Sequence, residues 1–258
     1  MEQQKAILAV TGLNVYYSSF HAVKDLSFSV YEGEIFGLLG PNGAGKTSTL
    51  SSIEGLVKPA SGTITVAGYD TRKNPLQARA NMGMQLQSTS FQPELNVDEI
   101  IQLYGALYGI KLTQNQIIDR LEDLKLLDAR NKKYGQLSGG QQQRLSLYIA
   151  TMHDPTLVML DEPTTGLDPQ SRRQLWSRIE TMKQRGHSIL LTTHSMEEAE
   201  AVCDRISIVD HGRLIETGTP ASLIEKYSNH PDVVAASRKG KITLEDVFIG
   251  LTGNAVRA

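Results

Sequence analysis

The sequence predicts an α/β fold: a mostly parallel sheet with helices on both faces and a helical subdomain inserted into the core. Two apolar runs, 34–39 and 157–160, have the length of strands buried on both faces, as parallel strands are. Strand-like and helix-like segments alternate along the second half of the chain, which is typical of such a sheet. The stretch in between, about 91–152, is predicted to be helical.

The first third of the chain is predicted to form antiparallel strands. The segment 26–30 (LSFSV) alternates apolar and polar side chains, and 61–68 (SGTITVAG) has the length of a short strand between turns. A helix is expected after Gly45. Gly55 and the nearby Pro59 are expected to end it, because glycine closes helices and proline does not continue them.

Two capping boxes mark helix starts in the middle of the chain. Asn96 is followed three residues later by Glu99, and Thr113 is followed in the same way by Gln116. In this arrangement each side chain satisfies a backbone N–H group that the first turn leaves free. We therefore expect helices to begin at these two points.

Strands and helices alternate after residue 152. Asp168-Pro169 is typical of a helix start, with proline in the first turn, and Gly186 is expected to end that helix. Ser195 and Glu198 form another capping pair. The strands expected in this part are 157–160, 188–193, 205–209 and 213–216.

The composition agrees with one large domain. A chain of 258 residues, 40% of them hydrophobic, can bury a sizeable core, and no repeat divides it. We expect a single domain over 1–258, with the subdomain at about 91–152 and a short tail at about 220–258. The 26 basic and 28 acidic residues nearly balance, so the charge gives no reason to expect nucleic acid as a partner.

Cysteine content and hydropathy bear on location. Cys203 is the single cysteine, so no internal disulfide can form, which fits a reducing cytoplasm. No apolar run approaches the roughly 20 residues that a membrane-spanning helix needs, and the N-terminus lacks the apolar stretch of a secretion signal. We therefore expect a soluble, cytoplasmic chain that reaches the inner face of a membrane through a partner.

The segment 40–47 (GPNGAGKT) matches the phosphate-binding loop (P-loop) motif G-x-x-x-x-G-K-[ST], between an expected strand and an expected helix. Glycines let the backbone aim N–H groups at phosphate oxygens, and the helix adds the positive end of its dipole. Lys46 is expected to reach the β- and γ-phosphates of ATP, and the Thr47 hydroxyl to ligate Mg²⁺. The alternative, a Gly-rich turn without a ligand, rarely occurs in this context. The expected nucleotide-binding residues are Gly40, Pro41, Asn42, Gly43, Ala44, Gly45, Lys46, Thr47 and Ser48.

Asp161 and Glu162 follow the apolar run 157–160. Parallel strands deliver the residues at their carboxyl ends to the ligand crevice of the sheet. Asp161 is expected to hold Mg²⁺, directly or through water, and Glu162 to polarise the attacking water as general base. Acids often simply end strands, so this pair is informative because a phosphate loop lies upstream.

The segment 137–144 (LSGGQQQR) precedes this strand, and here the chain resembles the ABC ATPases, whose signature loop reads LSGGQ. Over essentially the whole chain, the motifs follow the family's order: the P-loop, Gln87, LSGGQ, LVMLDE, GLD and His194. The resemblance implies a head-to-tail dimer with a second copy or a homologous subunit, in which each LSGGQ loop contacts the γ-phosphate held by the other. The residues implied in that contact are Ser138, Gly139, Gly140 and Gln141.

Three further positions are implied by the resemblance. Gln87 matches a glutamine that senses Mg²⁺ and the attacking water, and Gln85 is its rival. His194 follows the strand 188–193 and matches a histidine that hydrogen-bonds the γ-phosphate and helps to place the water. Asp168 matches an aspartate near the dimer interface, and it also fits the role of a helix N-cap.

The adenine ring needs a flat apolar face. The family stacks it on an aromatic side chain upstream of the phosphate loop, and the segment 15–20 (VYYSSF) offers Tyr16 and Tyr17. Position favours Tyr17. Either tyrosine could instead pack on a strand face.

The resemblance implies an ATPase subunit that powers an integral membrane permease. The alternative is a soluble ABC ATPase acting on DNA or ribosomes, but these usually carry two cassettes, a long coiled-coil insertion or zinc-binding cysteines. A generic P-loop kinase or GTPase would leave LSGGQ unexplained. The stretch 194–220 and the segment 242–253 (ITLEDVFIGLTG) are similar to drug- and polysaccharide-type exporter subunits, which favours export.

The segment 88–108 is expected to contact the permease, because it follows the expected γ-phosphate sensor and is rich in apolar residues. Phe91 and Leu95 precede a helix cap and are the expected partner-facing side chains. For Tyr104 and Tyr108, the alternative is that they fill the core of the subdomain.

Overall fold

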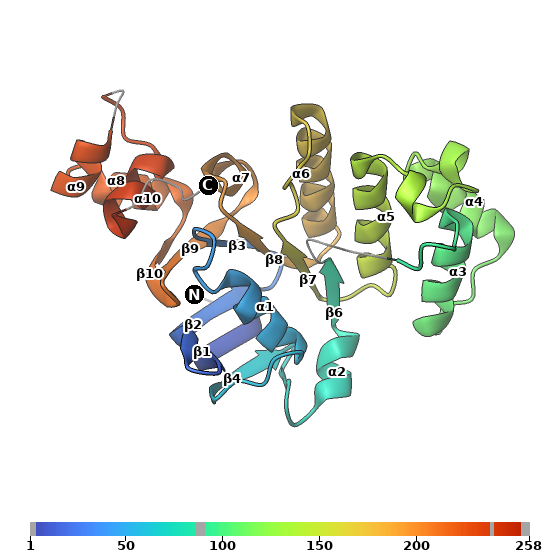
Figure 1. The fold of residues 1–258 in the computed structure, drawn as a ribbon, viewed down its shortest axis with the longest axis horizontal. Coiled ribbons are helices and arrows are strands. Elements are labelled where there is room, and N and C mark those ends of the chain that lie inside the picture. Colours follow the sequence, from blue (N-terminus) through green and yellow to red (C-terminus); the bar gives the residue numbers. More distant parts are fainter. Residues whose placement is uncertain (1–3, 86–90, 238–239, 254–258) are drawn as a thin grey trace.

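The computed structural model describes residues 4–85, 91–237 and 240–253, and its centre is a six-stranded sheet (Figure 1). Its strands are β3 (Ile35–Leu39), β6 (Met82–Gln85), β7 (Leu157–Asp161), β8 (Ser188–Thr193), β9 (Arg205–Asp210) and β10 (Arg213–Gly218). The order is β10-β9-β3-β8-β7-β6, and only the edge strand β10 pairs antiparallel. The predicted mostly parallel sheet is therefore confirmed.

A second, antiparallel sheet is formed by the N-terminal part of the chain. Its strands are β1 (Ala6–Tyr17), β2 (Phe20–Tyr31), β4 (Ser61–Val66) and β5 (Tyr69–Asp70). They are arranged in the order β2-β1-β4-β5. Helix α1 (Lys46–Glu54) packs between the two sheets, because its buried Leu50 and Ile53 share one apolar cluster with β1 and β7. The short helix α2 (Pro75–Ala80) leads into β6.

The other face of the six-stranded sheet is covered by α6 (Pro169–Gln184) and α7 (Met196–Val202). Buried side chains such as Leu175 of α6 and Ala199 of α7 join them to the sheet in a second apolar cluster. The C-terminal region, expected only as a short tail, adds α8 (Pro220–Tyr227), α9 (Pro231–Ala236) and α10 (Leu244–Thr252). Figure 1 shows these three helices grouped beside β10, and their Val247 and Phe248 belong to the same cluster.

The middle of the chain forms α3 (Val97–Leu107), α4 (Gln114–Asp123) and α5 (Gly139–Thr151), with short 3₁₀ turns before α5. The two predicted capping boxes are confirmed: Glu99 N donates to Asn96 Oδ1 at 3.0 Å and Gln116 N donates to Thr113 Oγ1 at 3.4 Å. The buried apolar side chains here form a third cluster, separate from the other two. Within the described ranges, no helix combines the length and apolar character that crossing a bilayer requires.

The expectation that Phe91 faces a partner is wrong. Its ring is only 5% exposed and makes edge contacts with the rings of Tyr104 and Tyr134, at centroid distances of 5.2 and 4.9 Å. Leu95 packs, partly buried, against the same cluster. The chain before the Asn96 cap folds back over the helices, so these side chains complete the local core.

Helix ends follow the predicted signals. Gly55 closes α1 with a φ of 79°, and Gly186 follows α6 with a φ of 96°, both in the left-handed region that glycine adopts without strain. Asp168 caps α6 and Ser195 caps α7.

Candidate functional site

The predicted phosphate loop lies between β3 and α1, and two of its glycines have no room for a side chain. A Cβ on Gly40 would lie 2.3 Å from the carbonyl oxygen of Val209, and one on Gly45 would lie 2.7 Å from that of Ala22. Gly45 also has a φ of 101°. The loop is therefore held against β9 and β2, which fixes the position of its backbone.

Lys46 begins α1 with an almost fully buried side chain. Its Nζ donates to the carbonyl oxygens of Gly40 at 2.8 Å and Pro41 at 3.2 Å, and lies 3.2 Å from Glu162 Oε1. Burial lowers the pKa of Lys46, and the carboxylates of Glu162 and Asp161 oppose that fall. The chain therefore holds an ammonium group inside the curve of the loop, where it can pair with a phosphate oxygen.

Asp161 ends β7 and accepts hydrogen bonds on both carboxylate oxygens. Thr47 Oγ1 donates to Oδ2 at 3.2 Å, and Thr192 Oγ1 donates to Oδ1 at 2.5 Å. These three residues meet because β3, β8 and β7 are neighbours whose carboxyl ends share one edge of the sheet.

The donor set at this point fits Mg²⁺. Magnesium in nucleotide sites is bound by one or two carboxylates together with hydroxyl, phosphate and water oxygens, which Asp161 and Thr47 match. No group of three or more His, Cys, Asp or Glu side chains in the described part of the chain could hold a metal ion.

Glu162 follows β7 with a φ of 46°, a backbone conformation that costs a non-glycine residue about 1–3 kcal/mol and that occurs often at functional sites. Its N–H donates to the carbonyl oxygen of Thr192 at 3.2 Å and to the hydroxyl oxygen of the same residue at 3.0 Å. The carboxylate lies 3.2 Å from Lys46 Nζ and 3.2 Å from His194 Nδ1, and accepts from Thr165 Oγ1 at 3.2 Å. The backbone strain thus places one carboxylate among a cation, a histidine and a hydroxyl.

Burial alone would raise the pKa of Glu162. The positive charge of Lys46, with its hydrogen bond, and the contacts with His194 outweigh that effect, so the pKa lies below its ordinary value. Glu162 is therefore ionised at neutral pH, which is the state that a general base needs.

A cavity of about 450 Å³ opens beside the phosphate loop. Tyr17 and Phe20, at the turn between β1 and β2, line it together with Glu162 and His194. Tyr16 does not line it and instead stacks on His21, with ring centroids 4.0 Å apart. The geometry supports Tyr17 over Tyr16 as a face for adenine, and Phe20 offers a second aromatic face that sequence reasoning missed.

The LSGGQ segment forms the start of α5 and lies apart from this cavity. Gln141 N donates to Ser138 Oγ at 3.3 Å, and Ser138 N donates to Gln141 Oε1 at 2.9 Å, which closes a capping box. Ser138 and Gly139 are exposed, and none of the residues 138–141 lines the cavity. One chain therefore does not bring LSGGQ to its own phosphate loop.

Of the other predicted site residues, Asp168 is described by the structure and Gln87 is not. Asp168 is exposed, and its Oδ1 accepts from the N–H groups of Gln170 and Ser171, both at 2.9 Å, so the expected N-cap is confirmed. Its role at an interface stays a prediction. Gln87 lies outside the described residues, and its rival Gln85 ends β6 with a buried side chain.

Sequence reasoning missed two hydroxyls at the site. Thr192 binds Asp161 and the backbone of Glu162, and Thr165 binds the Glu162 carboxylate. Thr192 lies in β8, where a threonine is expected for its strand propensity alone, so the sequence carries no separate sign of its second role.

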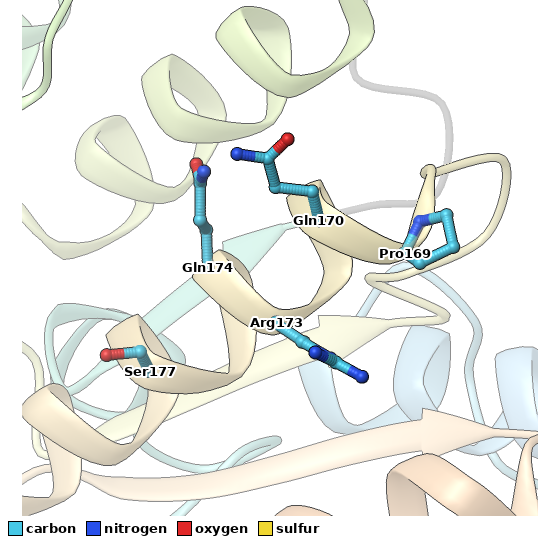
Figure 2. Close-up of a pocket in the computed structure, with 5 residues that line it drawn as sticks. All are labelled: Pro169, Gln170, Arg173, Gln174 and Ser177. Atoms are coloured by element: carbon cyan, nitrogen blue, oxygen red, sulfur yellow. The ribbon is translucent and has the colours of Figure 1, made fainter.

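A second groove, of about 510 Å³, runs along the exposed side of α6. Figure 2 shows that Gln170 and Gln174 point to the same side of the helix, whereas Arg173 points away from them. One helix supplies this lining and Arg173 is its single charged group, so the groove has neither the backbone cradle nor the carboxylates that phosphate chemistry needs. It is lined by Pro169, Gln170, Arg173, Gln174 and Ser177.

Comparison with known sequences gives a consistent result. A family model described as "ABC transporter" matches residues 23–165. The "Nod factor export ATP-binding protein I" of Burkholderia lata is 43% identical over 205 residues, which cover 79% of this chain and 67% of that protein. The protein of the same name from Burkholderia pseudomallei is 42% identical, over 92% of this chain and 94% of its own length.

Solved structures show the same likeness. An ATP-binding subunit of an ABC transporter superimposes with a TM-score of 0.81 at 28% identity, over 95% of this chain and 99% of its own. A nucleotide-free ATP-binding cassette from an ABC transporter superimposes with a TM-score of 0.75 at 25% identity, over 89% of this chain and 97% of its own.

Proposed function

The chain belongs to the ABC transporter family, and we propose that two copies, or one copy and a homologous subunit, hydrolyse ATP head to tail to drive export through a membrane permease. As a member of this family it is an ATP-binding subunit whose ATPase activity is coupled to transport. The observation that carries the proposal is the placement of the Glu162 carboxylate 3.2 Å from both Lys46 and His194, beside the Asp161–Thr47 pair.

Each side chain of this cluster has a distinct task. Lys46 and the N–H groups of the P-loop bind the phosphates, and Glu162 accepts a proton from the attacking water. His194 lies beside Oε2 of Glu162 and Lys46 beside Oε1, so His194 can orient that water. Thr47 and Asp161 would hold Mg²⁺, which when bound neutralises charge on the β- and γ-phosphates.

Support for pairing comes from the separation of LSGGQ from the cavity. The exposed start of α5 offers N–H groups and a helix N-terminus, a second phosphate-binding element with no phosphate site of its own in the same chain. A two-fold, head-to-tail pair would place each LSGGQ loop over the partner's P-loop.

Replacing Gly139 with aspartate is expected to prevent this pairing without disturbing the fold. A Cβ on Gly139 would meet no atom within 4 Å, so the side chain fits the single chain. In the pair its carboxylate would face the partner's γ-phosphate and repel it. We expect light scattering in saturating MgATP, in a Glu162→Gln background that slows hydrolysis, to find a dimer that the Gly139→Asp change abolishes.

Gly135→Asp is the matched control, because its Cβ is equally free of neighbours and it lies outside LSGGQ. A Gly139→Asp protein that dimerises as well as its parent would exclude the proposed interface.

Export as the direction of transport is supported by the names of two relatives, both export ATP-binding proteins. The segment 242–253, which resembles exporter subunits, contains all of α10 and packs into the core through Val247 and Phe248. Attachment to the inner face of the membrane would then come through the permease.

The permease contact is proposed at the end of α3, within the segment 88–108. With Phe91 buried, the large exposed apolar side chains among the described residues 91–108 are Leu107, 69% exposed, and Tyr108, whose ring stacks on His153 at 4.2 Å. His153 Nε2 lies 3.0 Å from the carbonyl oxygen of Met82 in β6, so this surface is joined to the strand that precedes residues 86–90.

Leu107→Glu is expected to leave ATP hydrolysis by the purified subunit within about twofold of wild type, because Leu107 is exposed and does not line the P-loop cavity. Recovery of the subunit with its permease from detergent-solubilised membranes should fall at least tenfold, since a buried charge without a partner opposes docking. Val234→Glu, at an exposed apolar residue of α9, serves as control. Normal recovery of the Leu107→Glu subunit would place the contact elsewhere.

A further inference from the structure

A further cavity, of about 570 Å³, lies between α4, α5 and α6. It shares no lining residue with the P-loop cavity. α5 lines it with Arg144 and the residues three, four and seven positions later, and α6 lines it with Gln174 and residues at the same spacing. One face of each helix therefore forms a wall. The end of α4 and the turn after it supply the rest of the lining.

The described lining residues include five cations and one acid. The chain as a whole is nearly neutral, so this excess of positive charge is local. The acid, Asp123, lies 3.9 Å from Arg120, and both side chains are exposed, so their pairing is weak. The cations are Arg120, Lys125, Arg144, Arg178 and Arg185.

Arg178 is a cation that the chain leaves without compensation. It is half-buried, and among the residues that the structure describes its guanidinium forms no hydrogen bond or ion pair. Arg144 and Arg178 together also line a smaller hollow beside Gly140, so the two arginines are neighbours. Burial lowers the pKa of Arg178, and the positive charge of Arg144 adds to that fall. Two half-buried like charges side by side favour the binding of an anion between them.

Arg144 is already oriented for a ligand. Its Nε donates to the carbonyl oxygen of Leu124 at 2.9 Å, which joins α5 to the turn after α4. A guanidinium has five donors in one plane, and this bond uses one of them. Tyr148, one turn further along α5, adds an aromatic ring and a hydroxyl to the same wall.

We propose that this cavity binds a small anion that carries two or more phosphate groups. Its volume falls in the range of small-molecule sites, roughly 300–1,000 Å³. A terminal phosphate carries about 1.5 to 2 negative charges and three acceptor oxygens, and arginine binds such oxygens with paired hydrogen bonds. A single carboxylate would balance only one of the cations. The proposed hydrolysis uses none of these side chains, so the inference is independent of it.

Binding of inorganic tripolyphosphate without Mg²⁺ tests the proposal. Calorimetry would use the full chain with Lys46→Ala, so that the P-loop contributes little, in about 0.15 M salt, which screens exposed charges beyond about 8 Å. We expect saturable binding. Arg178→Gln should raise the dissociation constant about tenfold or more, the range for a lost hydrogen bond to a charged group.

Arg173→Gln is the matched control. It makes the same change of charge on the same helix, at an exposed residue that points away from Gln174 (Figure 2) and does not line the cavity. It should leave the dissociation constant within about twofold of the parent. Arg178→Gln should not lower the melting temperature of the free chain, because the charge that it removes has no partner.

Asp123→Asn should act in the opposite direction. It removes the negative charge of the lining, so tripolyphosphate should bind about twofold or more tightly. A damaged fold does not tighten binding, so this variant decides the question even if Arg178→Gln fails to fold. An unchanged or weaker affinity in folded Asp123→Asn would overturn the inference.

Two more probes identify the ligand. If ATP without Mg²⁺ binds more tightly than tripolyphosphate and depends equally on Arg178, the site takes nucleotides; if it binds no more tightly, the site takes the phosphate chain itself. Citrate should bind more weakly than tripolyphosphate, and equal affinity would overturn the assignment to phosphate. Absence of saturable tripolyphosphate binding, an unchanged affinity in Arg178→Gln, or an equal loss in Arg173→Gln would overturn the site.

Discussion

Replacing Glu162 with glutamine is expected to lower the turnover of ATP about a hundredfold or more, within the range for a lost general base, while ATP still binds. The carboxylate has the two properties that such a base requires. It is held in place by Thr192, Thr165 and the positive φ of its own backbone, and Lys46 keeps it ionised at neutral pH. Glutamine has the same shape and cannot take up the proton.

Phosphate release under saturating MgATP measures this turnover, and equilibrium dialysis with labelled ATP measures binding. Glu122→Gln, on the exposed side of α4, makes the same chemical change away from the site and should leave both unchanged. Hydrolysis at the wild-type rate by Glu162→Gln would show that another group serves as base.

Local signals made much of the fold predictable. Four helices start at a residue whose side chain satisfies free N–H groups, and the structure shows each of these residues as an N-cap: Asn96, Thr113, Asp168 and Ser195. β6 has no such signal: its sequence, MGMQ, carries little strand propensity, and pairing with β7 places it at the edge of the sheet. Its existence depends on tertiary contacts that a single segment does not reveal.

Burial of Phe91 could not be predicted for a related reason. An aromatic residue before a helix cap fits a partner surface and a folded-back core segment equally well. Phe91 is buried because its ring meets that of Tyr134 edge to face, with centroids 4.9 Å apart, and Tyr134 is distant in sequence.

Motif order predicted the site residues, but not how they are held. The meeting of Thr47, Asp161 and Glu162 depends on the strand order β3-β8-β7, which the composition of no single strand reveals. Thr192 lies in the strand between the other two, where it donates to the Asp161 carboxylate and accepts from the backbone N–H of Glu162. In the sequence it looks like an ordinary strand residue. Contacts of LSGGQ with a second chain are likewise not seen in the fold of one chain.

Replacing Lys46 with alanine is expected to raise the dissociation constant for ATP about a hundredfold or more. Removing one partner of a buried charge pair costs about 2–5 kcal/mol, and about 1.4 kcal/mol corresponds to a factor of ten. The 4% exposure of Lys46 means that water replaces its charge poorly. The loss also removes the charge that holds down the pKa of Glu162, so that pKa should rise as burial dominates.

Equilibrium dialysis with labelled ATP tests the effect, with Lys58→Ala, an exposed lysine beyond α1, as control. The double variant Lys46→Ala with Glu162→Gln separates two causes of weaker binding. If Lys46→Ala acts partly by leaving an unpaired carboxylate beside the phosphates, the neutral glutamine should recover part of the affinity, because repulsion between Glu162 and the γ-phosphate is then removed. If the loss is entirely that of the Lys46 contact, the double variant should bind as weakly as Lys46→Ala alone. Wild-type affinity in Lys46→Ala itself would mean that the loop's N–H groups hold the nucleotide without the lysine, and the assignment of Lys46 to the phosphates would be wrong.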